Sequence, residues 1–141
     1  MRYCVPKRFK LAVLYARDDP RISDFLNAER QETLCREYCE SNKIAVLRSV
    51  RVRCDSATSL ELMKTLLLTL PPEVDTLLAV RFSDYCTYLP DLGRLCLMYQ
   101  CRQIFVQTLD NPGPLYRYLH CLRVEDFDLA DARYEALKQQ K

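Results

Sequence analysis

Leu11-Ala12-Val13-Leu14-Tyr15-Ala16 is the stretch of this sequence that decides the fold. The run is almost continuously apolar, which is typical of a strand covered by protein on both faces. We therefore predict a strand over residues 9–16 at the centre of a sheet. Charged residues and a proline at 17–20 then end the strand.

Helices and strands alternate along the rest of the sequence. Apolar residues at helical spacing predict helices over 23–42, 59–70 and 88–101, and the second helix stops at Pro71-Pro72. Apolar or alternating runs predict strands over 44–52, 74–82 and 103–109, of which the alternating first one suits a sheet edge. This order is typical of an α/β fold in three layers, α/β/α, with a mostly parallel sheet of four to five strands.

The C-terminal region is expected to add a short strand over 115–124 and a final helix over 125–140. One side of that helix is apolar and carries Phe127, Ala130, Tyr134 and Leu137. This side needs a partner, which is either the same domain or a second copy of the chain. We carry forward the second option, a homodimer formed through the C-terminal helix.

Length and composition indicate one globular domain over residues 1–141, with a core at about 9–110 and an interface segment at about 115–141. Of the 141 residues, 49% are hydrophobic and 28% are charged, and the net charge of +2 supplies no strong basic field for a stand-alone DNA-binding protein. The sequence has no membrane-spanning run and no signal peptide near its start, so we expect a cytoplasmic protein without membrane contact. Its eight cysteines are expected to be free thiols.

Several local runs resemble one family. Leu14-Tyr15-Ala16-Arg17 is similar to a strand that ends in Tyr-Ala-Arg, and the run from Ala28 to Cys39 is similar to a Gln-containing first helix. The apolar strand from Val74 to Phe82 has a counterpart as well. Over about residues 9–110 the chain thus resembles the catalytic domain of the serine recombinases, the resolvases and invertases. The resemblance implies a resolvase-like fold.

The active-site positions depart from that family. Its nucleophilic serine stands two residues after the arginine of the first strand, where this chain has Arg17 followed by Asp19. Its third strand leads into Lys/Arg-Leu-Asp-Arg-x-x-Arg, where this chain has Ser83, Asp84 and Thr87. Because the family cleaves DNA with the serine and stabilises the charged transition state with arginines, the resemblance implies a degenerate site.

We therefore expect a catalytically inactive recombinase-like domain that needs no cofactor. It would serve as a regulatory or assembly module that self-associates, and DNA contact would be weak or indirect. Arg17 remains as an anion-binding candidate. Arg51 and Arg53, near the family's arginine after the second strand, are further candidates, although alternating charges on an edge strand are also typical of a solvated face.

A second hypothesis rests on aspartates at the ends of predicted strands. Asp18, Asp19 and Asp84 supply the carboxylate oxygens that Mg²⁺ prefers, which suits a phosphoryl-handling or receiver-like domain. A receiver also needs a lysine after its last strand, and no lysine lies between Lys64 and Lys138. Helix capping is the competing explanation for these aspartates.

A third hypothesis is a plain protein-interaction module. The C-terminal segment contains Tyr116, Tyr118 and Tyr134, and aromatic side chains of this kind are common both in interfaces and in ordinary cores. The sequence does not separate these two uses.

Overall fold

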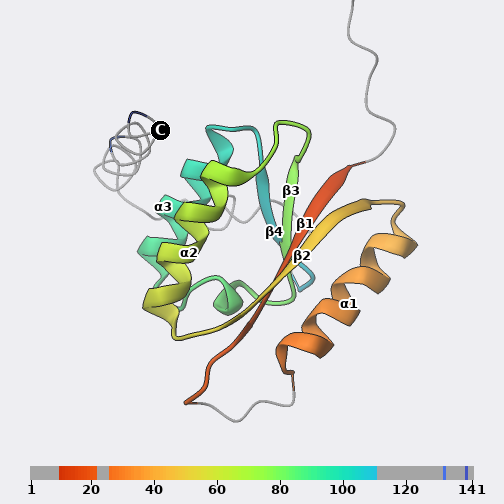
Figure 1. Cartoon of the computed structure of the whole chain (residues 1–141), viewed down its shortest axis with the longest axis horizontal. Helices are drawn as coiled ribbons and strands as arrows, with labels where there is room; N and C mark the ends of the chain where they lie inside the picture. The colour runs from red at the N-terminus through yellow and green to blue at the C-terminus, as the bar shows by residue number, and fades with distance from the viewer. Residues whose placement is uncertain (1–9, 22–25, 111–131, 133–138, 140–141) are drawn as a thin grey trace, which may run out of the picture.

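The computed structural model describes residues 10–21, 26–110, 132 and 139 of the chain. A four-stranded sheet, parallel throughout and ordered β2-β1-β3-β4, forms the middle layer (Figure 1). In chain order the elements are β1 (Leu11–Asp18), α1 (Ala28–Ser41), β2 (Ala45–Arg53), α2 (Ser56–Thr69), β3 (Thr76–Ala79), the 3₁₀ turn η1 (Phe82–Asp84), α3 (Leu89–Gln100) and β4 (Phe105–Thr108). The predicted α/β class, the central first strand and the edge position of the second strand are confirmed.

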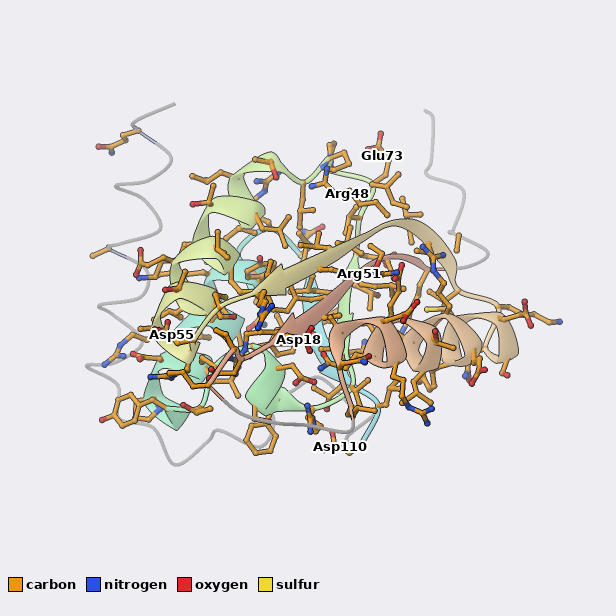
Figure 2. The ribbon with its side chains drawn as sticks, turned by 60° about the horizontal axis from the view of Figure 1, so that its bottom comes forward. Asp18, Arg48, Arg51, Asp55, Glu73 and Asp110 are labelled. Carbon is orange, nitrogen blue, oxygen red and sulfur yellow. The ribbon has the colours of Figure 1, made fainter. Side chains whose placement is uncertain are left out.

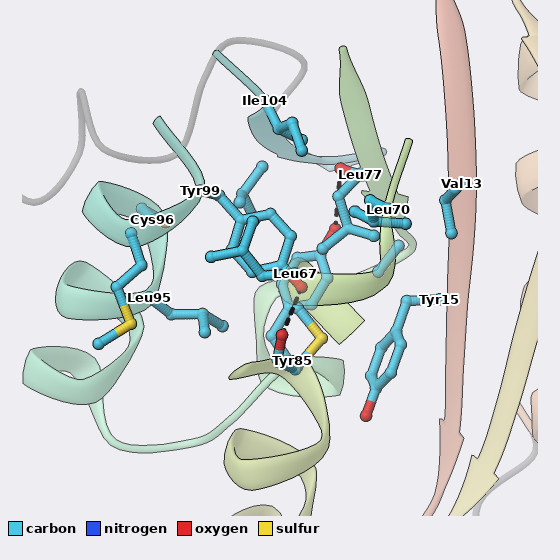
Figure 3. Packing of buried hydrophobic residues seen from close by; sticks show 14 of the residues in the cluster. Val13, Tyr15, Leu67, Leu70, Leu77, Tyr85, Leu95, Cys96, Tyr99 and Ile104 are labelled. Carbon is cyan, nitrogen blue, oxygen red and sulfur yellow. Dashed lines mark hydrogen bonds between the residues drawn. The ribbon is translucent and has the colours of Figure 1, made fainter. Parts of the chain in front are cut away.

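Both faces of β1 are buried, which explains its continuous apolar run. Val13 and Tyr15 pack with α2 and α3 in the larger hydrophobic cluster, part of which is drawn in Figure 3. Ala12 and Leu14 point the other way and pack with α1 in a second cluster. Because α1 covers one face of the sheet and the other two helices cover the opposite face, the predicted three-layer arrangement is also confirmed (Figure 1).

The first helix begins later than its predicted start at residue 23. Asn27 caps it, since its side-chain oxygen accepts a hydrogen bond from the backbone N–H of Arg30 at 2.9 Å. Asp18, at the end of β1, accepts another from the N–H of Ala28 at 2.8 Å. The two caps fix the helix start against the end of the central strand.

The second helix, by contrast, begins three residues earlier than the predicted position 59. The side chain of Asp55 caps it by accepting a hydrogen bond from the N–H of Thr58 at 2.8 Å. This aspartate, which follows β2, therefore acts as a capping residue.

The third strand is shorter than the predicted range 74–82. It ends at Ala79, and the chain then turns through η1, where the carboxylate of Asp84 accepts a hydrogen bond from the N–H of Arg81 at 3.0 Å. The fourth strand is shorter as well, at Phe105–Thr108. Early termination of β3 places the polar turn η1 directly beside the end of β1.

The predicted fifth strand, final helix and interface segment lie outside the described residues. Within the part of the chain that the structure describes, no helix has the length and apolar character needed to cross a membrane.

Candidate functional site

A pocket of about 130 Å³ lies where β1 and β3 end. Its lining consists of polar residues from the ends of these strands and from the turn that follows β3: Arg17, Asp18, Asp19, Arg81, Ser83, Asp84 and Thr87. All five positions that the family resemblance assigned to the degenerate active site thus lie together. Figure 2 shows Asp18 at this edge of the sheet, with Asp55 and Asp110 toward the same edge. Parallel strands bring their carboxyl ends to one edge, which is where open α/β sheets bind ligands.

By the family resemblance Arg17 matches the arginine that ends the first strand, and its guanidinium is bound to the chain's own backbone. Nε donates to the carbonyl oxygen of Asp84 at 3.0 Å, Nη1 to that of Cys54 at 3.0 Å, and Nη2 to that of Ser83 at 2.7 Å. The residue is only 8% exposed. Arg17 therefore ties the end of β1 to the segments that follow β2 and β3.

The family resemblance matches Asp19 to the nucleophilic serine. Its carboxylate accepts hydrogen bonds from the backbone N–H of Arg21 at 2.9 Å and from the Arg21 guanidinium at 3.3 Å, and it lies 3.7 Å from Nη1 of Arg17. The hydrogen bonds from Arg21 hold the pKa of Asp19 below its usual value. An ionised carboxylate therefore stands where the family has a neutral hydroxyl.

Asp84 is buried, and its carboxylate belongs to the turn η1. One oxygen accepts from the backbone N–H of Arg81 at 3.0 Å, and the other lies 2.9 Å from Nη2 of the same arginine. Burial raises the pKa of Asp84, although the neighbouring Arg81 opposes that shift. An aspartate thus shapes the backbone at the position where the family has an arginine.

The three carboxylates of the Mg²⁺ hypothesis serve three different parts of the chain. Asp18 caps α1, Asp19 binds Arg21, and Asp84 holds the turn η1. Among the described residues, no group of three or more His, Cys, Asp or Glu side chains is placed to hold a metal ion. The described structure therefore lends this hypothesis no support.

Thr87 is held to the start of α2. Its backbone N–H donates to the hydroxyl of Ser56 at 2.8 Å, and its own hydroxyl lies 3.1 Å from the same oxygen. The resemblance matches this position to an arginine of the family. Here the short side chain joins the turn after β3 to the second helix and brings no positive charge.

A buried hydrogen-bond chain links Tyr15, two residues before Arg17, to Tyr85, the residue that follows Asp84. Ser59 Oγ donates to the carbonyl of Tyr85 at 2.6 Å and lies 2.7 Å from the hydroxyl of Tyr15. Because Ser59 has a single hydroxyl proton, Tyr15 donates in the second bond. The rings of Tyr15 and Tyr85, both labelled in Figure 3, stack with their centroids 5.8 Å apart. Burial raises the pKa of Tyr15 to about 12. These bonds hold β1, α2 and the turn after β3 together.

Arg51 and Arg53 do not line the pocket. Both belong to the edge strand β2, and Arg51 pairs with Glu32 of α1 at 2.5 Å. Sequence reasoning gave no role to Arg81, which does line the pocket. Its signal was its position three residues before Asp84, a spacing that suits mutual capping of a short turn.

The electrostatic balance of the pocket disfavours phosphate. Two arginines and three aspartates line it, so its formal charge is negative. Three of the five N–H donors of Arg17 bind backbone carbonyls, and Arg81 is paired with the buried Asp84. A cluster of guanidinium groups that could stabilise a phosphoryl transition state is not formed by the described residues.

Two solved catalytic domains are similar to this chain in structure. The N-terminal catalytic domain of TP901-1 integrase superimposes with a TM-score of 0.60 at 12% identity, over 94% of this chain and 99% of that one. The C-terminal catalytic domain of ISC1926 TnpA, an IS607-like serine recombinase, gives a TM-score of 0.56 at 12% identity, over 91% of this chain and 99% of that one. No protein-family model and no curated protein matches the sequence. The likeness supports the resemblance at the level of fold: the chain has the architecture of serine recombinase catalytic domains.

Proposed function

We propose that this chain is a catalytically inactive, serine-recombinase-like domain that works as a regulatory or assembly module without a metal or organic cofactor. The observation that carries this proposal is the state of Arg17. Its three nitrogens donate to the carbonyl groups of Cys54, Ser83 and Asp84. An arginine committed to the backbone in this way supports the fold and has little capacity left for a DNA phosphate.

The residues around Arg17 support the same conclusion. DNA cleavage by this fold needs a hydroxyl nucleophile and several positive charges that stabilise the transition state. Asp19 supplies a carboxylate paired with Arg21, and Asp84 and Thr87 supply no positive charge. Loss of both parts favours a module that has kept the architecture and lost the chemistry. DNA contact, on this proposal, is weak or made through a partner in the cytoplasm.

Self-association is the second part of the proposal. It rests on the apolar side of residues 125–140, which carries Phe127, Tyr134 and Leu137. An apolar helix face of this kind commonly pairs across a two-fold axis. A homodimer would allow an inactive domain to regulate assembly without cutting DNA.

The first test is a cleavage assay on the full chain with supercoiled plasmid. We expect neither nicked DNA nor protein covalently attached to DNA, because the pocket has no activated hydroxyl and a negative formal charge. A covalent adduct that is lost in Asp19→Asn would overturn the proposed inactivity.

Light scattering of the full chain tests the proposed dimer. The expected mass is that of two copies, and Leu137→Glu should reduce it to one, because a charge on the apolar side disfavours burial. Gln139→Glu, on the opposite side of the same predicted helix, introduces the same charge at an exposed position and is the matched control, which should leave the dimer intact. A single-copy mass for the unmodified chain would exclude self-association and leave the proposed inactivity to be judged by the cleavage assay.

A further inference from the structure

Among the described residues, no strand lies beside the outer edge of the sheet at β2. Within the described residues, β2 pairs with β1 alone, and it runs for nine residues, whereas β3 and β4 have four each. An edge strand presents a row of unpaired N–H and C=O groups, and these can pair with an added strand. The pairing with β1 skips one residue at Leu47, which forms a bulge, so the regular part of the edge is Arg48–Arg53.

An apolar groove lies beside this edge, between β2 and α2. It has a volume of about 250 Å³ and is lined by Tyr15, Val50, Val52, Leu62, Thr65, Leu66 and Thr69. Leu62 is 40% exposed although it is a large apolar residue. The helix carries leucines around its whole circumference, a pattern that is typical of a helix with cover on more than one side. The groove is therefore an apolar surface suited to a partner.

Apolar and basic side chains alternate along the edge strand, and they point to opposite faces of the sheet. Val50 and Val52 pack with the cluster that includes α2. Arg51 points to the opposite face, where it pairs with Glu32 of α1, and Arg53 is two residues further along the strand on the same side. Figure 2 shows Arg48 and Arg51 on opposite sides of the β2 ribbon. From Val50 to Arg53 the edge thus has an apolar side and a basic side, and Arg48, which donates to Thr69 of α2, lies before them on the side of the valines.

We propose that β2 binds an extended segment of a partner protein, added to the sheet as a further strand, in which apolar and acidic residues alternate. Every second side chain of such a segment lies over the groove beside Val50 and Val52, and the others face Arg51 and Arg53. The backbone supplies hydrogen bonds, and the two sets of side chains supply specificity. This proposal concerns the edge opposite to β4 and does not rest on the loss of DNA cleavage.

Charge favours an acidic partner over a second copy of this chain at the same edge. On its α1 side β2 carries a row of two arginines, Arg51 and Arg53, of which Arg51 is paired with Glu32, and the strand has no acidic residue. Two β2 strands set side by side would place the arginines of one copy close to those of the other, and like charges across a strand pair are destabilising. The carboxylates of an acidic segment would instead be attracted to the same arginines.

The test uses the full chain and a fluorescent synthetic peptide of alternating valine and glutamate, about as long as β2, with fluorescence polarisation as the readout. A peptide of alternating valine and lysine is the charge control. We expect binding at low salt that weakens as salt is added, and roughly tenfold weaker binding of the lysine peptide. A glutamate peptide that is N-methylated at every residue should lose binding, because it has no N–H groups to pair with the edge.

Substitutions at two exposed positions test where the peptide binds. Arg53→Glu and Leu62→Glu should each weaken binding of the glutamate peptide by roughly tenfold. Arg30→Glu, an exposed charge reversal on α1, should leave binding unchanged. Equal affinity for the two peptides, or no binding of either, would contradict the proposal. A solution mass of two copies that Leu62→Glu reduces to that of one copy would also contradict it, because a second copy of the chain would then fill the groove.

Discussion

The Nη2 atom of Arg17 donates a hydrogen bond to the carbonyl oxygen of Ser83 at 2.7 Å. Both residues stand at positions where the serine recombinase resemblance places catalytic groups. Their contact is internal: the guanidinium satisfies the backbone of the turn that follows β3. The candidate site of this chain is therefore built as a joint between strand ends, and most of its polar groups are already bound to one another.

Replacement of Arg17 should destabilise the chain strongly. Arg17→Met would leave the carbonyl groups of Cys54, Ser83 and Asp84 without their donor, and one acceptor left unsatisfied in a buried position costs about 1–3 kcal/mol. Urea unfolding followed by circular dichroism measures the change in the free energy of unfolding.

A lysine at the same position gives the control. Arg17→Lys keeps the positive charge but lacks the fork of donors, so its loss of stability should be smaller than that of Arg17→Met and still clear. If the methionine variant unfolds at the same urea concentration as the unmodified chain, Arg17 is not a structural residue and the central interpretation of the site is wrong.

The buried carboxylate of Asp84 should make stability depend on pH. Its pKa is raised by burial above the usual 3.8, so the folded chain holds the proton more tightly than the unfolded chain does. The contribution of Asp84 is thus most favourable at low pH and declines as the pH rises through the raised pKa. Asp84→Asn keeps an oxygen that accepts from the N–H of Arg81, and its amide side chain does not ionise.

Unfolding curves of the two proteins at several pH values isolate this effect. The stability of the unmodified chain relative to Asp84→Asn should fall as the pH increases from below 4 toward neutrality. A difference that rises over that range would mean that the ion pair with Arg81 outweighs burial, with the pKa of Asp84 lowered instead.

Magnesium should have no specific effect on this protein. A ligand that binds the folded state raises Tm according to its concentration and affinity, and the carboxylates of Asp18, Asp19 and Asp84 are already used in three separate places. Thermal unfolding in millimolar Mg²⁺ and in EDTA should give the same Tm. A saturable increase that Asp19→Asn removes would establish the metal-dependent alternative.

Cysteine reactivity should follow exposure. Burial raises the pKa of Cys35 and of Cys86 to about 12, whereas Cys101 is exposed. Because the thiolate is the reactive form, iodoacetamide at mildly alkaline pH should label Cys101 much faster than these buried thiols. Peptide mapping by mass spectrometry gives the rates. Labelling of Cys35 as fast as that of Cys101 would show that the α1 side of the core opens readily.

The fold could be predicted from the sequence because the residue patterns that define its strands and helices are local. A strand buried on both faces, such as β1, needs an unbroken apolar run, and an edge strand such as β2 permits alternation with arginines. Residues at the ends of parallel strands must share one edge, so the grouping of Arg17, Asp19 and Asp84 followed from the order of the elements. Element ends were less accurate, because caps such as Asn27 and Asp55 compete with equally suitable neighbours.

The hydrogen-bond partners of the site residues could not be predicted from the sequence. Nothing in the sequence shows that Arg17 donates to carbonyl groups, since any residue can supply a carbonyl and the choice depends on how three loops meet. The role of Arg81 was missed for a related reason. Its pairing with Asp84 exists only because β3 ends early and the chain turns, which the apolar run through residue 82 concealed.

The most direct test of the central claim is cleavage of supercoiled plasmid by Asp19→Ser, with denaturing gels to detect protein attached to DNA. This change restores the hydroxyl at the family's nucleophile position and leaves the rest of the pocket as it is. We predict no nicking and no covalent adduct, because Arg17 stays bound to the backbone and positions 84 and 87 still lack positive charge. An adduct formed by Asp19→Ser at the restored serine would contradict the account, since it would show that the pocket can still bind and activate a DNA phosphodiester.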